Sequence, residues 1–547
     1  MKRWNVLSQI DDLSKLLDVL LKNRDVKTKT QKEEFLNPLP LKNYMKKFPL
    51  EFRKSLRDGK ELVERCMSEG VSIIIYGDYD SDGINATAIL YDTLKSELGY
   101  ESTFYFIPNR FEHSYGLTNA AVDAALVSAE SPEKALFITV DSGITAVETV
   151  SYIKNLGHEI ILTDHHQKPD QMPEADVVIW NDELVGAMVS WVFSRILGSK
   201  SSTSLALAAL ATVTDLYPVL GVNRSVVKKG LEILNSTPPL GLQKLLQVSG
   251  RRSKEVTTYD LGWVLGPRLN ASGRLEEASA SLQLVLEKDP KIAEELALKL
   301  HGVNAERQDK TLEMYALASH VDENNLPKVI VSAHEDYHEG IIGLVASRLV
   351  QKYYRPSIVI SLNDGFGKGS VRSVAGINII EILRKFENLF ESLGGHPMAA
   401  GFTIKRENIE ELEKGLLKVF AKEVSEDLLT PVLDIDAEIP VSLVGPKLLE
   451  TLDKLKPFGL GNKEPVFTSS GLRVESISYV GKGKEHVSLK LSEGGAGGTH
   501  KAIFFNGKDL VSELGVGDTV DVAYSVSRNE FNGRVYTDLV VKDLKIK

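Results

Sequence analysis

Residues 71–83 read Val-Ser-Ile-Ile-Ile-Tyr-Gly-Asp-Tyr-Asp-Ser-Asp-Gly and predict both a fold and a site. Its first half is a short, continuously apolar run, which is typical of a strand buried on both faces of a parallel sheet. Its second half places Asp78, Asp80 and Asp82 directly after that strand. Ligands bind beyond the carboxyl ends of strands in open α/β sheets, so the pattern predicts a site at this edge.

Two later apolar runs, residues 135–140 and 159–163, have the same character and also end in polar groups. Asp141 follows the first run, and the triplet Asp164-His165-His166 follows the second. Three loops that are distant in sequence would therefore deliver carboxylates and imidazoles to one crevice. Asp215 ends an alanine-rich helical stretch and can close this cluster from the side.

The acidic run after the first strand has two competing explanations, a solvated turn and a calcium loop. An EF-hand loop that begins at Asp78 needs a Glu at its twelfth position, where the chain has Ile89, and a helix before it rather than a strand. Neighbouring carboxylates repel one another, and a bound cation relieves that repulsion. Oxygen and imidazole ligands without thiolates favour Mn²⁺, the first choice, or Mg²⁺, although zinc stays open. Two such ions about 4 Å apart would serve phosphoester hydrolysis.

The composition limits the class of protein. A chain of 547 residues is too long for one core and predicts three or four domains. No run approaches the roughly 18 apolar residues of a membrane span, and no secretory signal follows Met1, so we expect a soluble protein without a membrane partner. The single cysteine, Cys66, fits a reducing, cytoplasmic location. A net charge of -10 argues against generic DNA binding but permits local basic grooves.

The pattern of apolar residues along the chain predicts an α/β protein with several domains. Its first 54 residues show helical periodicity and are interpreted as a helical preface. We expect a parallel-sheet domain over residues 55–230, a helical connection with one long helix over 231–325, a second α/β domain over 326–424, and a small β-barrel over 428–547.

Several of these motifs resemble those of the DHH phosphoesterases. Residues 77–83, 139–143 and 164–166 are similar to the first three motifs of that superfamily, and residues 107–110, 267–274, 340–348, 369–373 and 394–401 are similar to motifs of its RecJ family. The resemblance implies a DHH domain, a long connecting helix, a DHH-associated domain and an OB-fold. It also implies an exonuclease that degrades single-stranded DNA from the 5′ end to 5′-mononucleotides, in DNA repair and recombination.

The resemblance further implies roles for the clustered residues. Asp80 and Asp141 would hold one ion, while Asp82, Asp141, His165 and Asp215 would hold the other, and His166 would face the scissile phosphate. Asp164 is interpreted as a partner that fixes a histidine tautomer. Asp78 is counted in the predicted set of metal ligands, although it can instead lie beside the metal site without binding an ion.

Candidate substrate-binding residues lie outside the metal cluster. A pocket for the terminal phosphate needs planar cationic groups and hydroxyls, although each arginine alone is as easily a surface ion pair. The predicted set is Arg110, Tyr115, Arg268, Asn270, Arg274, Asn304, Arg307, Gln308, Ser370, Arg372, Gly394, Gly395 and His396. In the barrel, Tyr524, Arg528, Phe531, Arg534 and Tyr536 are candidates for stacking and for a basic groove, although each aromatic can instead be core.

Two other classes of function remain open at this point. A phosphodiesterase for small molecules or oligonucleotides would lack the OB-fold, and a catalytically silent binding relative would have lost ligand residues. The expected partner is single-stranded DNA, with a single-stranded-DNA-binding protein and a helicase as further candidates, and the expected state is a monomer.

Overall fold

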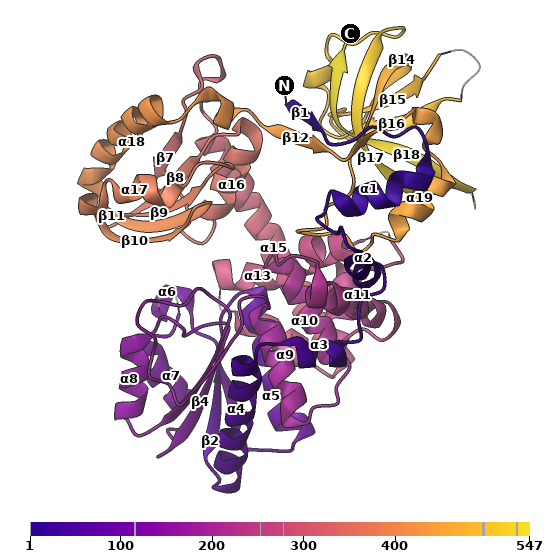
Figure 1. Cartoon of the computed structure of the whole chain (residues 1–547). Coiled ribbons are helices and arrows are strands. Elements are labelled where there is room, and N and C mark those ends of the chain that lie inside the picture. The colour runs from indigo at the N-terminus through magenta and orange to yellow at the C-terminus, as the bar shows by residue number, and fades with distance from the viewer. Residues whose placement is uncertain (1, 114–115, 252, 277, 495–497, 532–533) are drawn as a thin grey trace. The chain divides into compact units, whose positions relative to one another are not determined.

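The computed structural model describes residues 2–547 apart from 114–115, 252, 277, 495–497 and 532–533 (Figure 1). The chain divides into two compact units. Unit 1 consists of Met1–Arg3, Pro267–Ser281 and Glu295–Val432, and unit 2 consists of Trp4–Gly266, Leu282–Glu294 and Leu433–Lys547. The predicted α/β class with a second α/β domain and a C-terminal barrel is confirmed.

A parallel sheet in unit 2 carries the strands expected from the sequence. Its order is β3-β2-β4-β5-β6, with β2 at Ser72–Tyr76, β4 at Ala135–Val140 and β5 at Glu159–Asp164. These three strands are almost entirely buried, as continuous apolarity predicts. The edge strands β3 (Thr103–Phe106) and β6 (Val177–Trp180) were not expected, because they are short and only partly buried.

Helices cover both faces of this sheet (Figure 1). The helices α7 (Asn119–Ser128) and α8 (Val147–Asn155) pack with apolar residues of β2, β4 and β5 on one face. On the other side, α5 (Ser81–Tyr91) contacts both α9 (Gly186–Leu197) and α10 (Thr203–Thr214), and α4 (Leu50–Ser68) contacts α9 and β6. This layering buries the sheet and leaves the carboxyl ends of its strands for a site.

The N-terminal segment is not a separate helical preface. It contains the strand β1 (Arg3–Val6), which pairs with β12 (Val432–Ile435), before the helices α1 (Leu16–Lys22), α2 (Lys29–Leu36) and α3 (Leu41–Lys47). Ile10, Leu16 and Leu20 pack into the core of the C-terminal barrel. The expected limits at residues 54 and 230 also fall inside α4 and α11 (Gly221–Ser236), because amphipathic helices continue across them.

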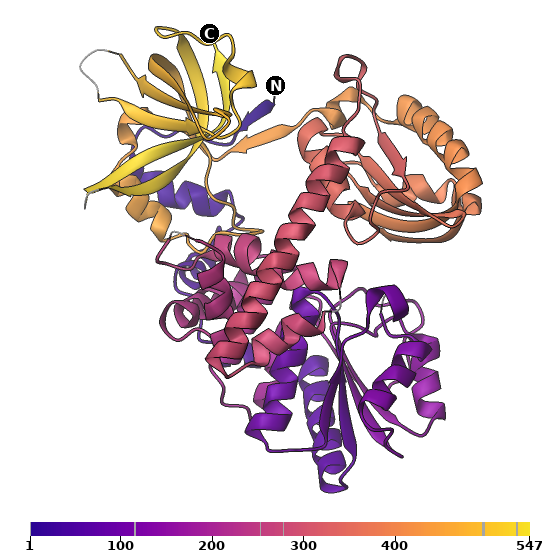
Figure 2. The ribbon, with the colours of Figure 1, turned by 180° about the vertical axis from the view of Figure 1, so that it is seen from behind.

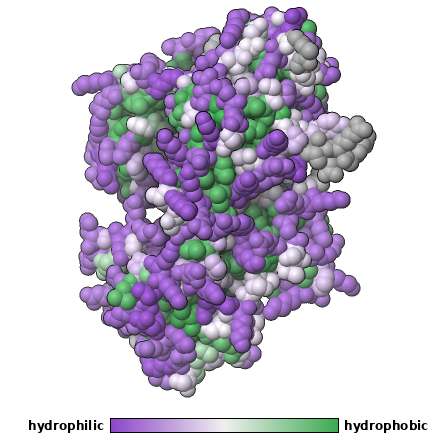
Figure 3. All heavy atoms as spheres, turned by 45° about the vertical axis from the view of Figure 1, so that its right-hand side comes forward, coloured by the Kyte–Doolittle hydropathy of each residue, from purple (hydrophilic) through white to green (hydrophobic). Residues whose placement is uncertain are grey.

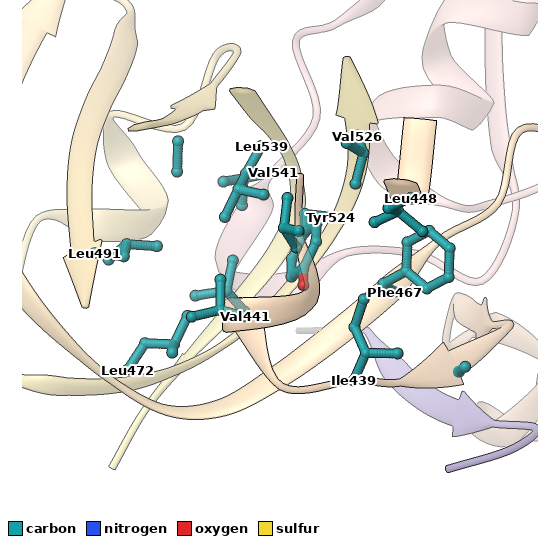
Figure 4. Packing of buried hydrophobic residues seen from close by; sticks show 14 of the residues in the cluster. Ile439, Val441, Leu448, Phe467, Leu472, Leu491, Tyr524, Val526, Leu539 and Val541 are labelled. Carbon is teal, nitrogen blue, oxygen red and sulfur yellow. The ribbon is translucent and has the colours of Figure 1, made fainter. Parts of the chain in front are cut away.

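The C-terminal barrel has the strand order β14-β15-β16-β18-β17, and β17 pairs back to β14, which closes it. Its strands are β14 (Phe467–Val480), β15 (His486–Ser492), β16 (His500–Phe504), β17 (Thr519–Phe531) and β18 (Arg534–Ile546). Figure 4 shows Tyr524 within the core, among Phe467, Val541 and Leu448 of α19 (Pro446–Asp453). Alternating apolar residues thus face inward, as a barrel requires.

Unit 1 is built on a mixed sheet of order β10-β11-β9-β8-β7. The strands are β7 (Ile330–His334), β8 (Ser357–Asn363), β9 (Phe366–Arg372), β10 (Phe390–His396) and β11 (Ala399–Lys405). The helices α16 (Ile342–Tyr353), α17 (Ile379–Arg384) and α18 (Ile409–Glu423) pack against them. Gly394, Gly395 and His396 form the end of strand β10 and pair with β11.

Helices connect the two α/β parts of the chain. After α11 come α12 (Leu240–Val248), α13 (Gly266–Leu275), α14 (Ser279–Leu286) and the long α15 (Pro290–Ala318), which is continuous in Figure 2. Among the described residues, none of the helices combines the length and apolarity that crossing a membrane requires. Hydrophilic residues also dominate the face of the molecule shown in Figure 3.

Candidate active site

The ends of the parallel strands bring four predicted ligands together. Three of them are carboxylates that surround the fourth, the imidazole of His165. His165 Nε2 lies 2.8 Å from Asp141 Oδ1, 3.6 Å from Asp82 Oδ2 and 3.9 Å from Asp215 Oδ2. Two groups of three residues could each hold a metal ion, because within each group the ligand atoms lie within 4.8 Å of one another. One group is Asp141, His165 and His166, and the other is Asp82, His165 and Asp215. The convergence expected from three loops and a helix end is therefore present.

The start of α9 holds two of these carboxylates in place. Gly186 N and Ala187 N each donate to a different oxygen of Asp82 at 2.7 Å. Asp141 has a backbone φ of +58°, in the left-handed region that costs energy for a residue other than glycine. A Cβ on Gly186 would lie 2.6 Å from Asp141 Cβ, so only glycine permits this approach. The sequence analysis did not single out Gly186.

Asp78 and Asp80 lie beside these groups but in neither of them. Asp80 caps α5, since its Oδ1 accepts from Asp82 N at 2.8 Å and from Gly83 N at 3.1 Å. Asp78 is buried, and its Oδ1 accepts from Tyr79 N at 2.6 Å. Their charges nevertheless act on the cluster, since Asp80 helps to raise the pKa values of Asp78, Asp82 and Asp141.

The electrostatics of the cluster favour a bound cation. Burial, reinforced by the neighbouring carboxylates, raises the pKa of Asp78 to about 8, of Asp82 to about 7 and of Asp215 to about 8. The same two causes raise the pKa of Asp141 well above its usual value. Such a cluster is stable in the ionised form only when positive charge neutralises it. Carboxylate oxygens with one imidazole are a donor set that fits Mn²⁺ or Mg²⁺.

The two adjacent histidines have opposite electrostatic environments. Burial and the charge of His166 lower the pKa of His165 to about 4, so His165 is a neutral imidazole with a lone pair for a metal. Burial opposes the charged form of His166, but a hydrogen bond and the charge of Asp164 raise its pKa to about 9. Asp164 Oδ1 accepts from His166 Nδ1 at 2.8 Å and from His165 N at 2.7 Å, while Oδ2 accepts from Ile144 N.

A groove of about 1680 Å³ in unit 2 includes Tyr217 near the metal cluster and extends to the barrel. Tyr259 and Trp263 line it with their rings stacked, 6.4 Å apart at the centroids and 25° from parallel. Both are exposed, at 66% and 68%, which is unusual for large aromatic side chains. Arg528 lines the far end and pairs with Asp453 at 2.9 Å. Neither aromatic residue belongs to a motif, so neither could be singled out from the sequence.

Unit 1 gathers predicted anion-binding residues around the start of α16. Gly343 lies so close to Arg372 Nη2 and Ser370 Oγ that a Cβ would be 3.0 Å from each. Arg274 Nη1 donates to Gly340 O at 3.3 Å. A helix N-terminus together with arginine side chains attracts anions.

A second arginine group in unit 1 lies on α15 and α13. Burial, together with the charges of Arg348 and Arg268, lowers the pKa of Arg307. Arg307 donates to Asn304 Oδ1 at 3.0 Å, and Arg268 donates to His301 Nδ1 at 3.3 Å. Buried, mutually repelling cations favour a bound anion.

The remaining predicted substrate residues have varied positions. Gln308 and Gly394 to His396 are exposed, and Asn270 is half-buried on α13. Tyr115 and the side chains of Arg110, Phe531 and Arg534 lie outside the described residues. Tyr536 is 45% exposed, as a stacking role needs. Tyr524 as a groove residue is wrong, because the ring is fully buried in the barrel and its hydroxyl bonds Ser469 Oγ at 2.8 Å.

Comparisons with known proteins give three family models and a set of relatives. The models are the DHH family N-terminal domain over residues 72–214, the DHHA1 domain over 326–422 and the RecJ OB domain over 435–543. The chain is 32% identical to the single-stranded-DNA-specific exonuclease RecJ of Thermus thermophilus, covering 90% of this chain and 71% of that protein. It is 28% identical to RecJ of Salmonella typhimurium, covering 97% and 96%.

Some relatives are longer than this chain. The match to RecJ of Bacillus subtilis is 32% identical over 90% of this chain but spans 64% of the relative. Among solved structures, RecJ of Thermus thermophilus in complex with Mn²⁺ superposes with a TM-score of 0.81 at 29% identity, covering 99% of this chain and 79% of that one. The Mg²⁺ complex of the same protein gives 0.75 at 27% identity, covering 99% and 78%.

Proposed function

This chain belongs to the RecJ family of single-stranded-DNA-specific exonucleases, and on that premise we propose that it hydrolyses single-stranded DNA from the 5′ end to 5′-mononucleotides. The observation that carries this proposal is the meeting of Asp82, Asp141 and His165, which are buried at the ends of the parallel strands, with Asp215 at the end of α10. Every predicted ligand is present, which argues against a catalytically silent relative.

These residues divide into ligands and groups that act on the substrate. Asp82, Asp141, His165 and Asp215 would hold divalent ions, with Asp78 and Asp80 as the further carboxylates. Bound Mn²⁺ or Mg²⁺ supplies Lewis acidity, which lowers the pKa of water and offsets the charge that develops on a phosphate.

His166 is suited to a direct contact with the scissile phosphate. Asp164 accepts from its Nδ1 and keeps the ring cationic at neutral pH, so Nε2 remains available to donate to a phosphate oxygen. Its side chain is 42% exposed, whereas that of His165 is 6% exposed. His165 is therefore suited to the metal and His166 to the substrate.

Recognition of a single strand is assigned to the groove of unit 2. The Tyr259–Trp263 pair offers aromatic faces on which unpaired bases stack, whereas the bases of a duplex are already stacked on one another. In unit 1, Ser370, Arg372 and the start of α16 suit a terminal phosphate, which would set the 5′-to-3′ direction.

The cellular setting follows from the substrate. We propose a role in DNA repair and recombination, where a helicase supplies single strands and a single-stranded-DNA-binding protein covers them. We propose residues 326–424 as the DHH-associated domain and 428–547 as the barrel, to which the N-terminal residues are assigned. The single cysteine fits a reducing, cytoplasmic location, and the proposed state of the enzyme is a monomer.

One experiment tests the proposal. The full chain with Mn²⁺ is incubated with 5′-phosphorylated single-stranded DNA, the same sequence as duplex, the corresponding RNA, and cyclic dinucleotides. We expect mononucleotides from the single strand alone, and a loss of at least about 1000-fold with Asp141→Asn, since the carboxylate that binds the ions is gone. Preference for cyclic dinucleotides, or activity that survives the substitution, contradicts the proposal.

A further inference from the structure

Tyr217 contacts the metal-binding histidine from the side opposite to the carboxylates. Its hydroxyl lies 2.6 Å from His165 Nδ1, and the two rings are 5.3 Å apart at their centroids. His165 Nε2 is the atom that lies toward Asp82, Asp141 and Asp215. Both nitrogens of the ring are thus engaged, one by the cluster and one by a neutral hydroxyl.

The end of α10 places this hydroxyl together with a metal ligand. Asp215 is the C-cap, Leu216 follows with a φ of +57°, and Tyr217 N donates back to Thr212 O at 3.1 Å while Leu216 N donates to Val213 O. This is a Schellman ending, in which glycine is usual at the left-handed position. Leu216 is 71% exposed, so its side chain does not explain the conformation. The turn instead directs Asp215 and Tyr217 to the same imidazole.

A histidine binds a metal through the lone pair of one nitrogen, so the proton must reside on the other. That proton needs an acceptor, and the partner that accepts it fixes the tautomer and the orientation of the ring. We propose that Tyr217 is a positioning residue, which holds His165 with Nε2 toward the carboxylates and so strengthens divalent metal binding. The inference rests on the metal site of the proposed function, but not on the identity of the substrate.

The partner of His165 Nδ1 is a hydroxyl rather than a carboxylate, and this difference has a chemical consequence. Asp164 beside His166 stabilises the cationic imidazolium. A carboxylate beside His165 Nδ1 would likewise favour the charged form of that ring. A tyrosine hydroxyl both donates and accepts, so it orients the imidazole without favouring its charged form.

The test is a Mn²⁺ titration of the full chain without DNA, followed by electron paramagnetic resonance of the free ion. Tyr217→Phe keeps the ring and removes the hydroxyl, and we expect Mn²⁺ affinity to fall roughly 10- to 100-fold. Excess Mn²⁺ should restore kcat to within about threefold of the wild type, because the ligands themselves are intact. Tyr100→Phe is the matched control, since it removes a hydroxyl that donates to Val71 O at 2.6 Å in the same domain.

The outcomes are distinct. Equal Mn²⁺ affinity in Tyr217→Phe and Tyr100→Phe overturns the positioning role, as does a loss of kcat that saturating Mn²⁺ does not restore. Circular dichroism and the melting temperature in EDTA show whether either variant is unfolded. If unfolding occurs, Tyr217→Gln, whose amide oxygen also accepts, should recover part of the affinity, and no recovery also overturns the proposal. Failure of the wild type itself to bind Mn²⁺ counts against the proposed function instead.

Discussion

At the scale of single residues, the site depends on a close approach between Asp141 and the first residue of α9. We expect Gly186→Ala to lower Mn²⁺ affinity and nuclease activity at least about tenfold, because the new Cβ would lie 2.8 Å from Asp141 Oδ1 and must displace that carboxylate. Gly302→Ala is the control, since that position in α15 is open, and it should stabilise the fold by about 0.5–1 kcal/mol. Unchanged metal affinity in Gly186→Ala would contradict this account.

The raised pKa values of the cluster predict how the metal-free protein responds to pH. Asp78, Asp82 and Asp215 hold protons in the folded state up to about pH 7 to 8 and lose them near pH 4 when unfolded. Folding therefore takes up protons between these values, and stability falls as pH rises, by up to about 1.4 kcal/mol per pH unit for each group.

The measurement is the melting temperature in EDTA from about pH 6.5 to 8.5, a window above the titration of unfolded aspartate. We expect the melting temperature to fall across this window and the fall to shrink in Asp82→Asn. Saturating Mn²⁺ should raise it most at the alkaline end. A metal-free protein that melts higher at pH 8.5 than at pH 6.5 would rule this out.

The residues proposed as ligands could be predicted from the sequence, but the groups that hold them in place could not. Asp141 and His165 follow buried strands, so their meeting could be predicted from the strands alone. Gly186 and Tyr217 could not, because their roles depend on where α9 and α10 pack against those strands. A glycine without a turn motif and a tyrosine outside any motif carry no local signal.

At the scale of elements, the start of α16 and the end of β9 predict how the chain recognises a terminal phosphate. We expect Arg372→Ala to raise KM at least about tenfold for 5′-phosphorylated single strands, with little change for 5′-hydroxyl strands, because a charge-assisted hydrogen bond is lost. Arg406→Ala is the control, since Arg406 pairs with Glu335 on the surface of the same unit. Equal effects on both kinds of 5′ end would refute a phosphate contact.

Strands could be predicted from the sequence where all their residues are buried, and less well at the edges of a sheet. The central strands β2, β4 and β5 follow from continuous apolarity, whereas β3 and β6 have half-buried, mixed sequences. Gly394 to His396 illustrate the same limit, since their pairing with β11 in the sheet is not visible in their own sequence.

At the scale of the whole molecule, the groove of unit 2 predicts a strand-binding contribution from aromatic stacking. We expect Trp263→Ala to weaken binding of single-stranded DNA by about 1–3 kcal/mol, measured by fluorescence anisotropy in the inactive Asp141→Asn background. Phe366→Ala removes an exposed aromatic ring in unit 1 and should have no such effect. If both variants bind equally, stacking on Trp263 is excluded.

Residues near the two ends of the chain form one hydrophobic core. Trp4 Nε1 donates to Asp543 Oδ2 at 2.7 Å, and Leu16 and Leu20 pack with Leu539 and Val541. During synthesis, the first helices therefore leave the ribosome more than 400 residues before the strand that covers them. Until then the nascent chain carries exposed leucines, which makes the earliest part of this protein the part most dependent on chaperones and the last to become protected from proteases.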